Sequence, residues 1–234
     1  MVWGLSMPSS FGDFFPQGNY VGWDEELTRY FNEEMTSEQR GPFVERGPIR
    51  YIRYVAGKFI NECGKKLPEL PPFGLIESHE PPQWYELRKR CTSLGSLIQL
   101  ADRLLAVDEI FKNIIERLEP GVHKFFPLQI TMPKGEVYPK RYFVMVIGQY
   151  LDSFLPDKST AGCWRDSGNG YYSAFDNLKA YLIGMAFSKD VFGKAHLWRE
   201  RHMYSPEVLF SDELQAEISN AGLRLPKHYQ MKAV

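Results

Sequence analysis

Two stretches rich in proline and glycine interrupt the N-terminal part of the chain. The first covers residues 40–48 (RGPFVERGP), and the second covers residues 67–74 (LPELPPFG), with a further Pro-Pro pair at residues 81–82. Proline has no backbone N–H and a fixed φ, so it is excluded from helix interiors and from central strands. We therefore predict a loop-rich N-terminal section over residues 1–90, followed by a regular domain over residues 91–234.

The composition is that of a folded protein without a charge bias. Of its 234 residues, 44% are hydrophobic and 15% aromatic, which is enough apolar surface to form a core. The 28 Lys and Arg residues are balanced by 29 Asp and Glu residues, so the net charge is -1. A dedicated nucleic-acid binder usually shows a basic excess. We expect a globular protein whose partner is not nucleic acid.

Cysteine usage and apolar runs predict a cytoplasmic protein. Cys63, Cys91 and Cys163 are odd in number and widely spaced, which argues against a disulfide framework and against a thiol-rich metal site. The initial residues MVWGLSMP lack the basic and apolar regions of a secretory signal. The longest apolar run, residues 142–147, is far shorter than the roughly 20 residues that span a membrane. No membrane association is expected.

Apolar periodicity predicts three helices and leaves a fourth segment ambiguous. Residues 24–35 carry an apolar stripe, residues 108–118 begin at the N-cap candidate Asp108, and residues 211–222 begin at the N-cap candidate Ser211. Residues 49–63 have helical apolar spacing, but the sequence RYIRYV within them also suits a strand. Both assignments of this segment stay open.

The C-terminal part of the chain also contains strand patterns. Residues 125–132 and 142–148 are rich in apolar and β-branched residues, and the turn-forming residues 133–135 lie between them. Residues 167–170 (SGNG) are a loop signal, and they lack the strand-before, helix-after context of a phosphate-binding loop. Because strands and helices do not alternate as βαβ units, we predict an α+β fold with a mixed or antiparallel sheet and packed helices.

The densest polar cluster is AHLWRERH at residues 195–202. In a strand, His196, Glu200 and His202 share one face, and two imidazoles with a carboxylate can bind a metal ion or exchange protons. Alternate residues of a strand lie about 7 Å apart, however, so the outer pair spans too far for easy chelation. The pattern favours a half-exposed strand with Trp198 in the core and the charged side chains in water.

The remaining histidines carry no recognisable catalytic motif. His123 directly follows the helix predicted at residues 108–118, and we expect its partial charge to complement the helix C-terminus. His79 and His228 lie in proline-bearing loops without an evident partner. The sequence also lacks a Gly-x-Ser-x-Gly nucleophile motif and a cysteine-nucleophile signature.

Aromatic residues are frequent in or beside the predicted loops. Such residues either anchor a protein interface or pin a loop to the core, and the sequence alone does not decide between these roles. They are Phe11, Phe14, Phe15, Tyr20, Trp23, Trp84, Tyr85, Trp164, Tyr171 and Tyr172.

Three blocks of sequence, in this order and spacing, resemble one known family. They are LEPGVHKFFP at residues 118–127, AHLWR at residues 195–199, and LFSDEL at residues 209–214 followed by AGL at 221–223. Over roughly residues 95–230 the chain is similar to a bacterial polymorphic-toxin immunity family, the eleventh in the usual numbering and formerly a domain of unknown function. The resemblance implies an α+β protein that binds and inactivates a cognate secreted toxin in the producing cell and its kin.

This resemblance implies a binding protein rather than an enzyme, with no catalytic residues, metal or cofactor. We expect it to occlude the active site of the toxin. The acidic residues 24–26 and 33–34 offer a face that would mimic nucleic acid if the toxin were a nuclease, although exposed helical acids are ordinarily only solvated. The alternative function is a small metal-dependent hydrolase that uses His196, Glu200 and His202. A purely structural or oligomeric module is a third possibility.

Overall fold

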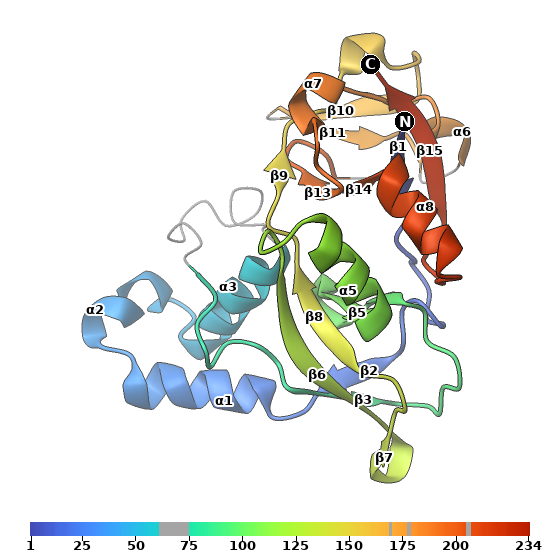
Figure 1. The fold of residues 1–234 in the computed structure, drawn as a ribbon. Helices are drawn as coiled ribbons and strands as arrows, with labels where there is room; N and C mark the ends of the chain where they lie inside the picture. The colour runs from blue at the N-terminus through green and yellow to red at the C-terminus, as the bar shows by residue number, and fades with distance from the viewer. Residues whose placement is uncertain (61–74, 169, 177–178, 205–206) are drawn as a thin grey trace.

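The protein has an α+β fold built on mixed β-sheets, as predicted (Figure 1). This computed structural model describes residues 1–60, 75–168, 170–176, 179–204 and 207–234. Cys63 and the proline-rich stretch 67–74 lie outside the described residues.

The larger sheet has seven strands among the described residues. Its order is β2-β3-β6-β8-β5-β4, with the short β7 added to β6. Only the β3–β6 pair is parallel, and the other described pairs are antiparallel. The strands are β2 Gly18–Tyr20, β3 Trp84–Leu87, β4 Leu97–Gln99, β5 Leu105–Asp108, β6 Lys124–Met132, β7 Glu136–Val137 and β8 Tyr142–Val146.

The second sheet joins the two ends of the chain. Its order is β12-β15-β1-β14-β13-β9, so the N-terminal β1 lies between the C-terminal strands β14 and β15. A separate hairpin, β10–β11, flanks the loop predicted at residues 167–170, of which Asn169 is not described. The strands are β1 Val2–Leu5, β9 Tyr150–Leu151, β10 Trp164–Gly168, β11 Tyr171–Ala174, β12 Ala186–Phe187, β13 Leu197–Glu200, β14 Val208–Ser211 and β15 His228–Ala233.

The helices follow the local capping signals. The side chain of Asp108 accepts a hydrogen bond from the backbone N–H of Phe111 at the start of α5, and Ser211 does the same for Leu214 in α8, so both predicted N-caps are confirmed. The helices are α1 Trp23–Arg29, α2 Ser37–Arg40, α3 Pro48–Ile60, α5 Glu109–Leu118, α6 Lys179–Leu182, α7 Lys189–Phe192 and α8 Asp212–Asn220. Single 3-10 turns cover 41–43, 101–103, 133–135 and 156–158.

The structure resolves the ambiguous segment 49–63 as helix α3 as far as Ile60. Pro48 is its first residue, where a missing N–H costs no helical hydrogen bond. One side of α3 is buried through Tyr51, Val55 and Phe59. The prediction for residues 24–35 is also confirmed, except that α1 ends at Arg29 and a π-helical turn continues to Glu34.

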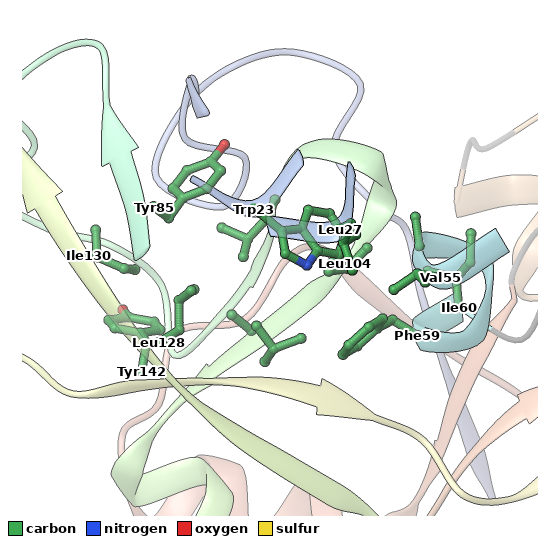
Figure 2. Packing of buried hydrophobic residues seen from close by; sticks show 14 of the residues in the cluster. Trp23, Leu27, Val55, Phe59, Ile60, Tyr85, Leu104, Leu128, Ile130 and Tyr142 are labelled. Carbon is green, nitrogen blue, oxygen red and sulfur yellow. The ribbon is translucent and has the colours of Figure 1, made fainter. Parts of the chain in front are cut away.

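Each face of the seven-stranded sheet packs against different helices. On the first face, α1 and α3 cover Tyr85 of β3 together with Leu128 and Ile130 of β6 and Tyr142 of β8, and these form one apolar cluster (Figure 2). On the second face, α5 and α8 pack over β4, β5 and β8 and join that sheet to β1, β13 and β14. A third cluster packs beneath the outer strands of the second sheet around Trp198.

Strand pairing crosses the predicted boundary at residue 90. Before that residue, β2 and β3 pair within the larger sheet and β1 pairs within the second sheet. The division into sections 1–90 and 91–234 stays a prediction, and these pairings are the contacts that a separation of the two parts would break. Within the described residues, we find no helix with both the length and the apolar character needed to cross a membrane.

Candidate functional site

Residues 197–200 of the polar segment 195–202 form strand β13, as predicted, but Arg199 and Glu200 are not solvated, whereas Arg201 is exposed. All four residues of β13 are buried, including Arg199 at 3% and Glu200 at 0% exposure. The reason is that both faces of the sheet are packed at β13, since Leu197 points into the second apolar cluster and Trp198 into the third. Arg199 forms an ion pair with the buried Glu207, with 3.1 Å between Nη1 and Oε1.

The three residues of the predicted hydrolase triad have separate partners. His196 Nδ1 lies 2.9 Å from Ser211 Oγ, and His202 Nδ1 lies 2.9 Å from Asp152 Oδ1. Glu200 instead accepts hydrogen bonds from residues at the end of β9. No group of three or more His, Cys, Asp and Glu among the described residues is placed to hold a metal ion. The structure therefore does not bring His196, Glu200 and His202 together at one site, and the alternative of a metal-dependent hydrolase gains no support from their arrangement.

Glu200 is held by the backbone and hydroxyl groups that follow β9. One carboxylate oxygen accepts from the N–H groups of Ser153, at 2.6 Å, and Phe154, at 3.3 Å. The other accepts from the Ser153 hydroxyl at 2.6 Å. Burial raises the pKa of the Glu200 carboxyl to about 7, and these hydrogen bonds offset only part of the increase.

We predict that Glu200→Gln removes part of the pH dependence of stability. The unfolded chain releases the Glu200 proton near its ordinary pKa of 4.5, whereas the folded chain holds it to about 7. Stability is therefore lost as the pH rises through this window, by about 3 kcal/mol for this group alone. Glutamine preserves the contacts, because its oxygen accepts from the two N–H groups and its amide donates to the rotatable Ser153 hydroxyl.

Urea unfolding at pH 5 and pH 8 measures this effect. The wild type is expected to lose more free energy of unfolding between the two pH values than the variant does. Comparing two proteins that share every other titrating group isolates the contribution of Glu200. An equal loss in both proteins would contradict the assignment.

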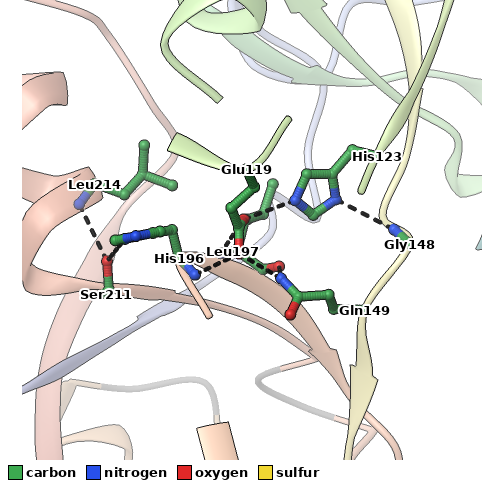
Figure 3. Close-up of polar contacts among 8 residues, drawn as sticks. All are labelled: Glu119, His123, Gly148, Gln149, His196, Leu197, Ser211 and Leu214. Carbon is green, nitrogen blue, oxygen red and sulfur yellow. Dashed lines mark hydrogen bonds and ion pairs between the residues drawn. The ribbon is translucent and has the colours of Figure 1, made fainter. Parts of the chain in front are cut away.

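A second buried carboxylate, Glu119, joins the two sheets. It directly follows α5 and is 7% exposed. Its oxygens accept hydrogen bonds from the backbone N–H groups of His196 at 2.7 Å and Leu197 at 3.0 Å, where β13 begins. They also accept from Gln149 Nε2 at 2.5 Å and His123 Nε2 at 2.7 Å. We call Glu119, His123, Gly148, Gln149, His196 and Leu197 the Glu119 cluster (Figure 3).

His123 belongs to this cluster, and its role differs from the predicted one. The side chain is buried, and its Nδ1 accepts a hydrogen bond from the N–H of Gly148 at 3.2 Å. Because Nδ1 accepts while Nε2 donates to Glu119, the geometry assigns a neutral imidazole with its proton on Nε2. His123 is therefore a buried link between α5 and the end of β8 rather than a side chain that complements the helix terminus from outside.

The electrostatics of Glu119 differ from those of Glu200. Burial alone raises the pKa of the Glu119 carboxyl, but the hydrogen bonds from His123, His196 and Gln149 outweigh it. The net result is a pKa below the ordinary value, so Glu119 is a stable anion at neutral pH. Such a group is suited to holding backbone donors in place rather than to exchanging protons.

The other singled-out polar residues have local partners. The ring of His79 stacks on Tyr30 with 3.5 Å between ring centroids, and its Nε2 lies 2.8 Å from the Tyr51 hydroxyl. His228 Nδ1 lies 2.9 Å from the carbonyl oxygen of Pro226. On the acidic face at residues 24–26 and 33–34, Arg29 pairs with Glu34 at 2.5 Å. Nucleic-acid mimicry by this face stays a prediction.

The aromatic residues divide between the two expected roles. Trp23 and Tyr85 are 3% and 1% exposed and belong to the core. Phe11 and Trp84 are 60% and 45% exposed, so they are the two most exposed aromatic residues of that set.

The three sequence blocks meet at one place in the structure. Glu119 and His123 come from the first block, His196 and Leu197 from the second, and Ser211 and Leu214 from the third (Figure 3). Ser211 caps α8 and also contacts His196, so one chain of hydrogen bonds links α5, β13 and α8. Glu119 stands in the first block, but no local pattern in the sequence distinguishes it from an ordinary residue at the end of a helix.

The model of the Imm11 immunity protein family matches residues 14–232, which is nearly the whole chain. The match includes the Glu119 cluster and most of the N-terminal section. A comparison with curated proteins found no match.

Proposed function

The chain belongs to the Imm11 immunity protein family, and from this premise we propose that it neutralises a cognate secreted toxin by binding it and occluding its active site. The family match over residues 14–232 is the observation that carries the proposal. Membership implies a protein that neutralises a toxin. We propose the cytoplasm of the producing bacterium and its kin as the place of action.

The geometry at the polar segment supports binding rather than catalysis. Glu119 and Glu200 satisfy backbone donors, His123 and His196 are hydrogen-bonded within the fold, and His202 pairs with a neighbouring carboxylate. Groups engaged in this way stabilise the shape of the protein. An inhibitor by occlusion needs such a rigid surface, since preorganisation reduces the entropy lost on binding.

Co-expression with the product of the adjacent gene tests the proposal. We expect that product to stop growth when expressed alone and to be tolerated when this protein is present. When the two proteins are purified together, they should form a stoichiometric complex. The enzymatic activity of the toxin should fall in proportion to the amount of this protein added. Titration of toxin activity at fixed toxin concentration measures that stoichiometry.

Two results would contradict the proposal. Equal toxicity with and without this protein would remove the immunity function. Complete protection at amounts far below one equivalent would instead indicate catalytic turnover, and the His196→Ala and His202→Ala variants would then identify whether those side chains take part. An unrelated protein expressed at the same level is the control for growth.

A further inference from the structure

The second face of the seven-stranded sheet is covered over only part of its width. Helix α5 packs over β5 and β8, and Figure 1 shows it on that side of the sheet. Strand pairing aligns Trp84 of β3 with Gln129 of β6, and their neighbours Tyr85 and Ile130 point into the core on the first face. Trp84 and Gln129 therefore point to the second face, where both are exposed.

A groove lies over this uncovered part of the sheet, next to α5. It has a volume of about 800 Å³ and runs along β3, β6 and the segment from β7 to β8. Its wall combines polar and apolar surface, and two of its apolar side chains are well exposed, with Trp84 at 45% and Val137 at 56%. The lining residues used below are Trp84, Gln129, Val137, Lys140, Arg141 and Phe143.

The charged residues among the described lining of this groove are both cationic. They are Lys140 and Arg141, on the connection between β7 and β8. Lys140 Nζ lies 3.7 Å from Asp108 Oδ2, and Arg141 Nη1 lies 3.2 Å from Glu109 Oε1. The Arg141 and Glu109 side chains are 78% and 47% exposed, and exposed ion pairs are weak, so a partner carboxylate can compete for Arg141. The Asp108 side chain is only 3% exposed, so Lys140, which is itself 52% exposed, stays paired with this buried carboxylate.

We propose that this groove is the surface that docks the toxin, and that it receives a toxin segment with carboxylates next to apolar side chains. The inference rests on the proposed function and adds the location and the chemistry of the contact. Tryptophan and arginine are enriched among the residues that dominate binding energy at protein interfaces, and this groove exposes one of each. Arg141 supplies charge complementarity to a carboxylate, and the exposed apolar side chains of Trp84 and Val137 supply area to bury.

The same features disfavour two other occupants. A second copy of this chain, docked through the same face by two-fold symmetry, would bring its own Lys140 and Arg141 into the interface, and the described lining of the groove offers no carboxylate to receive them. Nucleic acid usually needs a broad basic surface, and here two cations stand in an otherwise uncharged lining.

Two groove variants with matched controls test the proposal. Trp84→Ala and Arg141→Glu should each weaken binding to the purified toxin domain by at least about tenfold, and the effect of Arg141→Glu should shrink as salt is raised. Phe11→Ala removes an exposed aromatic side chain outside the groove, and Lys194→Glu reverses an exposed charge outside it. Both controls should bind within about twofold of the wild type. Calorimetric titration measures affinity, and thermal unfolding verifies that each variant is folded.

The outcomes separate the two proposals. Wild-type binding with unchanged affinity in both groove variants would overturn the docking surface and leave the immunity function intact. Weaker binding in Phe11→Ala or Lys194→Glu, but not in the groove variants, would place the contact elsewhere. A wild-type protein that neither binds the toxin nor protects against it would overturn the proposed function itself.

Discussion

Glu119→Gln is expected to lower the free energy of unfolding by about 3 kcal/mol. Each carboxylate oxygen of Glu119 accepts from two nitrogens: one from His196 and Gln149, the other from Leu197 and His123. A glutamine presents only one oxygen, so its amide nitrogen must face two N–H donors. One of these two donors is the backbone N–H of His196 or Leu197, which cannot become an acceptor. Where the other donor is His123, its Nε2 can accept only in the other tautomer, and that tautomer loses the contact with Gly148. Unsatisfied buried donors cost about 1–3 kcal/mol each.

A matched substitution on helix α5, which directly precedes Glu119, separates this effect from a general loss of charge. Glu116 lies on α5 and its partner is Lys112, with the Glu116 side chain 46% exposed. Glu116→Gln should therefore change stability by only a few tenths of a kcal/mol. For a chain of this length, the Glu119 variant should melt about 6–12 °C below the wild type. Equal melting temperatures for the two variants would show that the Glu119 cluster does not hold the sheets together.

Local signals in the sequence predicted much of the fold. Helices α5 and α8 begin at the residues whose side chains cap them, because an N-cap acts on a backbone N–H only three positions away. The β6 and β8 strands were likewise predictable from short apolar runs. For residues 49–60 the sequence left helix and strand open, and packing of one apolar side of α3 against the sheet decides between them.

The arrangement around β13 could not be predicted in the same way. Whether Arg199 and Glu200 face water depends on what packs on the two faces of the sheet, and the apolar clusters on these faces are assembled from segments far apart in the sequence. Glu119 and His196 are 77 positions apart, and no local pattern indicates that they meet. The resemblance to the immunity family was informative here, because its three blocks supply residues that contact one another in the structure. In the sequence, Trp84 is one of ten aromatic residues in or beside the predicted loops. Its exposure on an uncovered face of the sheet distinguishes it in the structure.

Gly148→Ala is expected to lower the free energy of unfolding by about 3 kcal/mol, although Gly148 is exposed. A Cβ atom at this position would lie 1.9 Å from the carbonyl oxygen of Val122, so backbone must move. Movement would separate the end of β8 from the turn before β6 and weaken the hydrogen bond from Gly148 to His123. Overpacking costs about 1–3 kcal/mol, and the lost hydrogen bond adds about 1 kcal/mol.

Gly12→Ala is the control, since a Cβ atom there would meet nothing within 4 Å. Its stability should stay within about 1 kcal/mol of the wild type, and the lower entropy of the unfolded chain favours a small increase. Urea unfolding of the two alanine variants, of Glu119→Gln and of the double variant Glu119→Gln with Gly148→Ala completes the test. His123 contacts both residues, so the double variant should lose at least about 1 kcal/mol less than the sum of the single losses. Strict additivity would mean that His123 does not couple the two sites, and that the Glu119 cluster is two independent contacts.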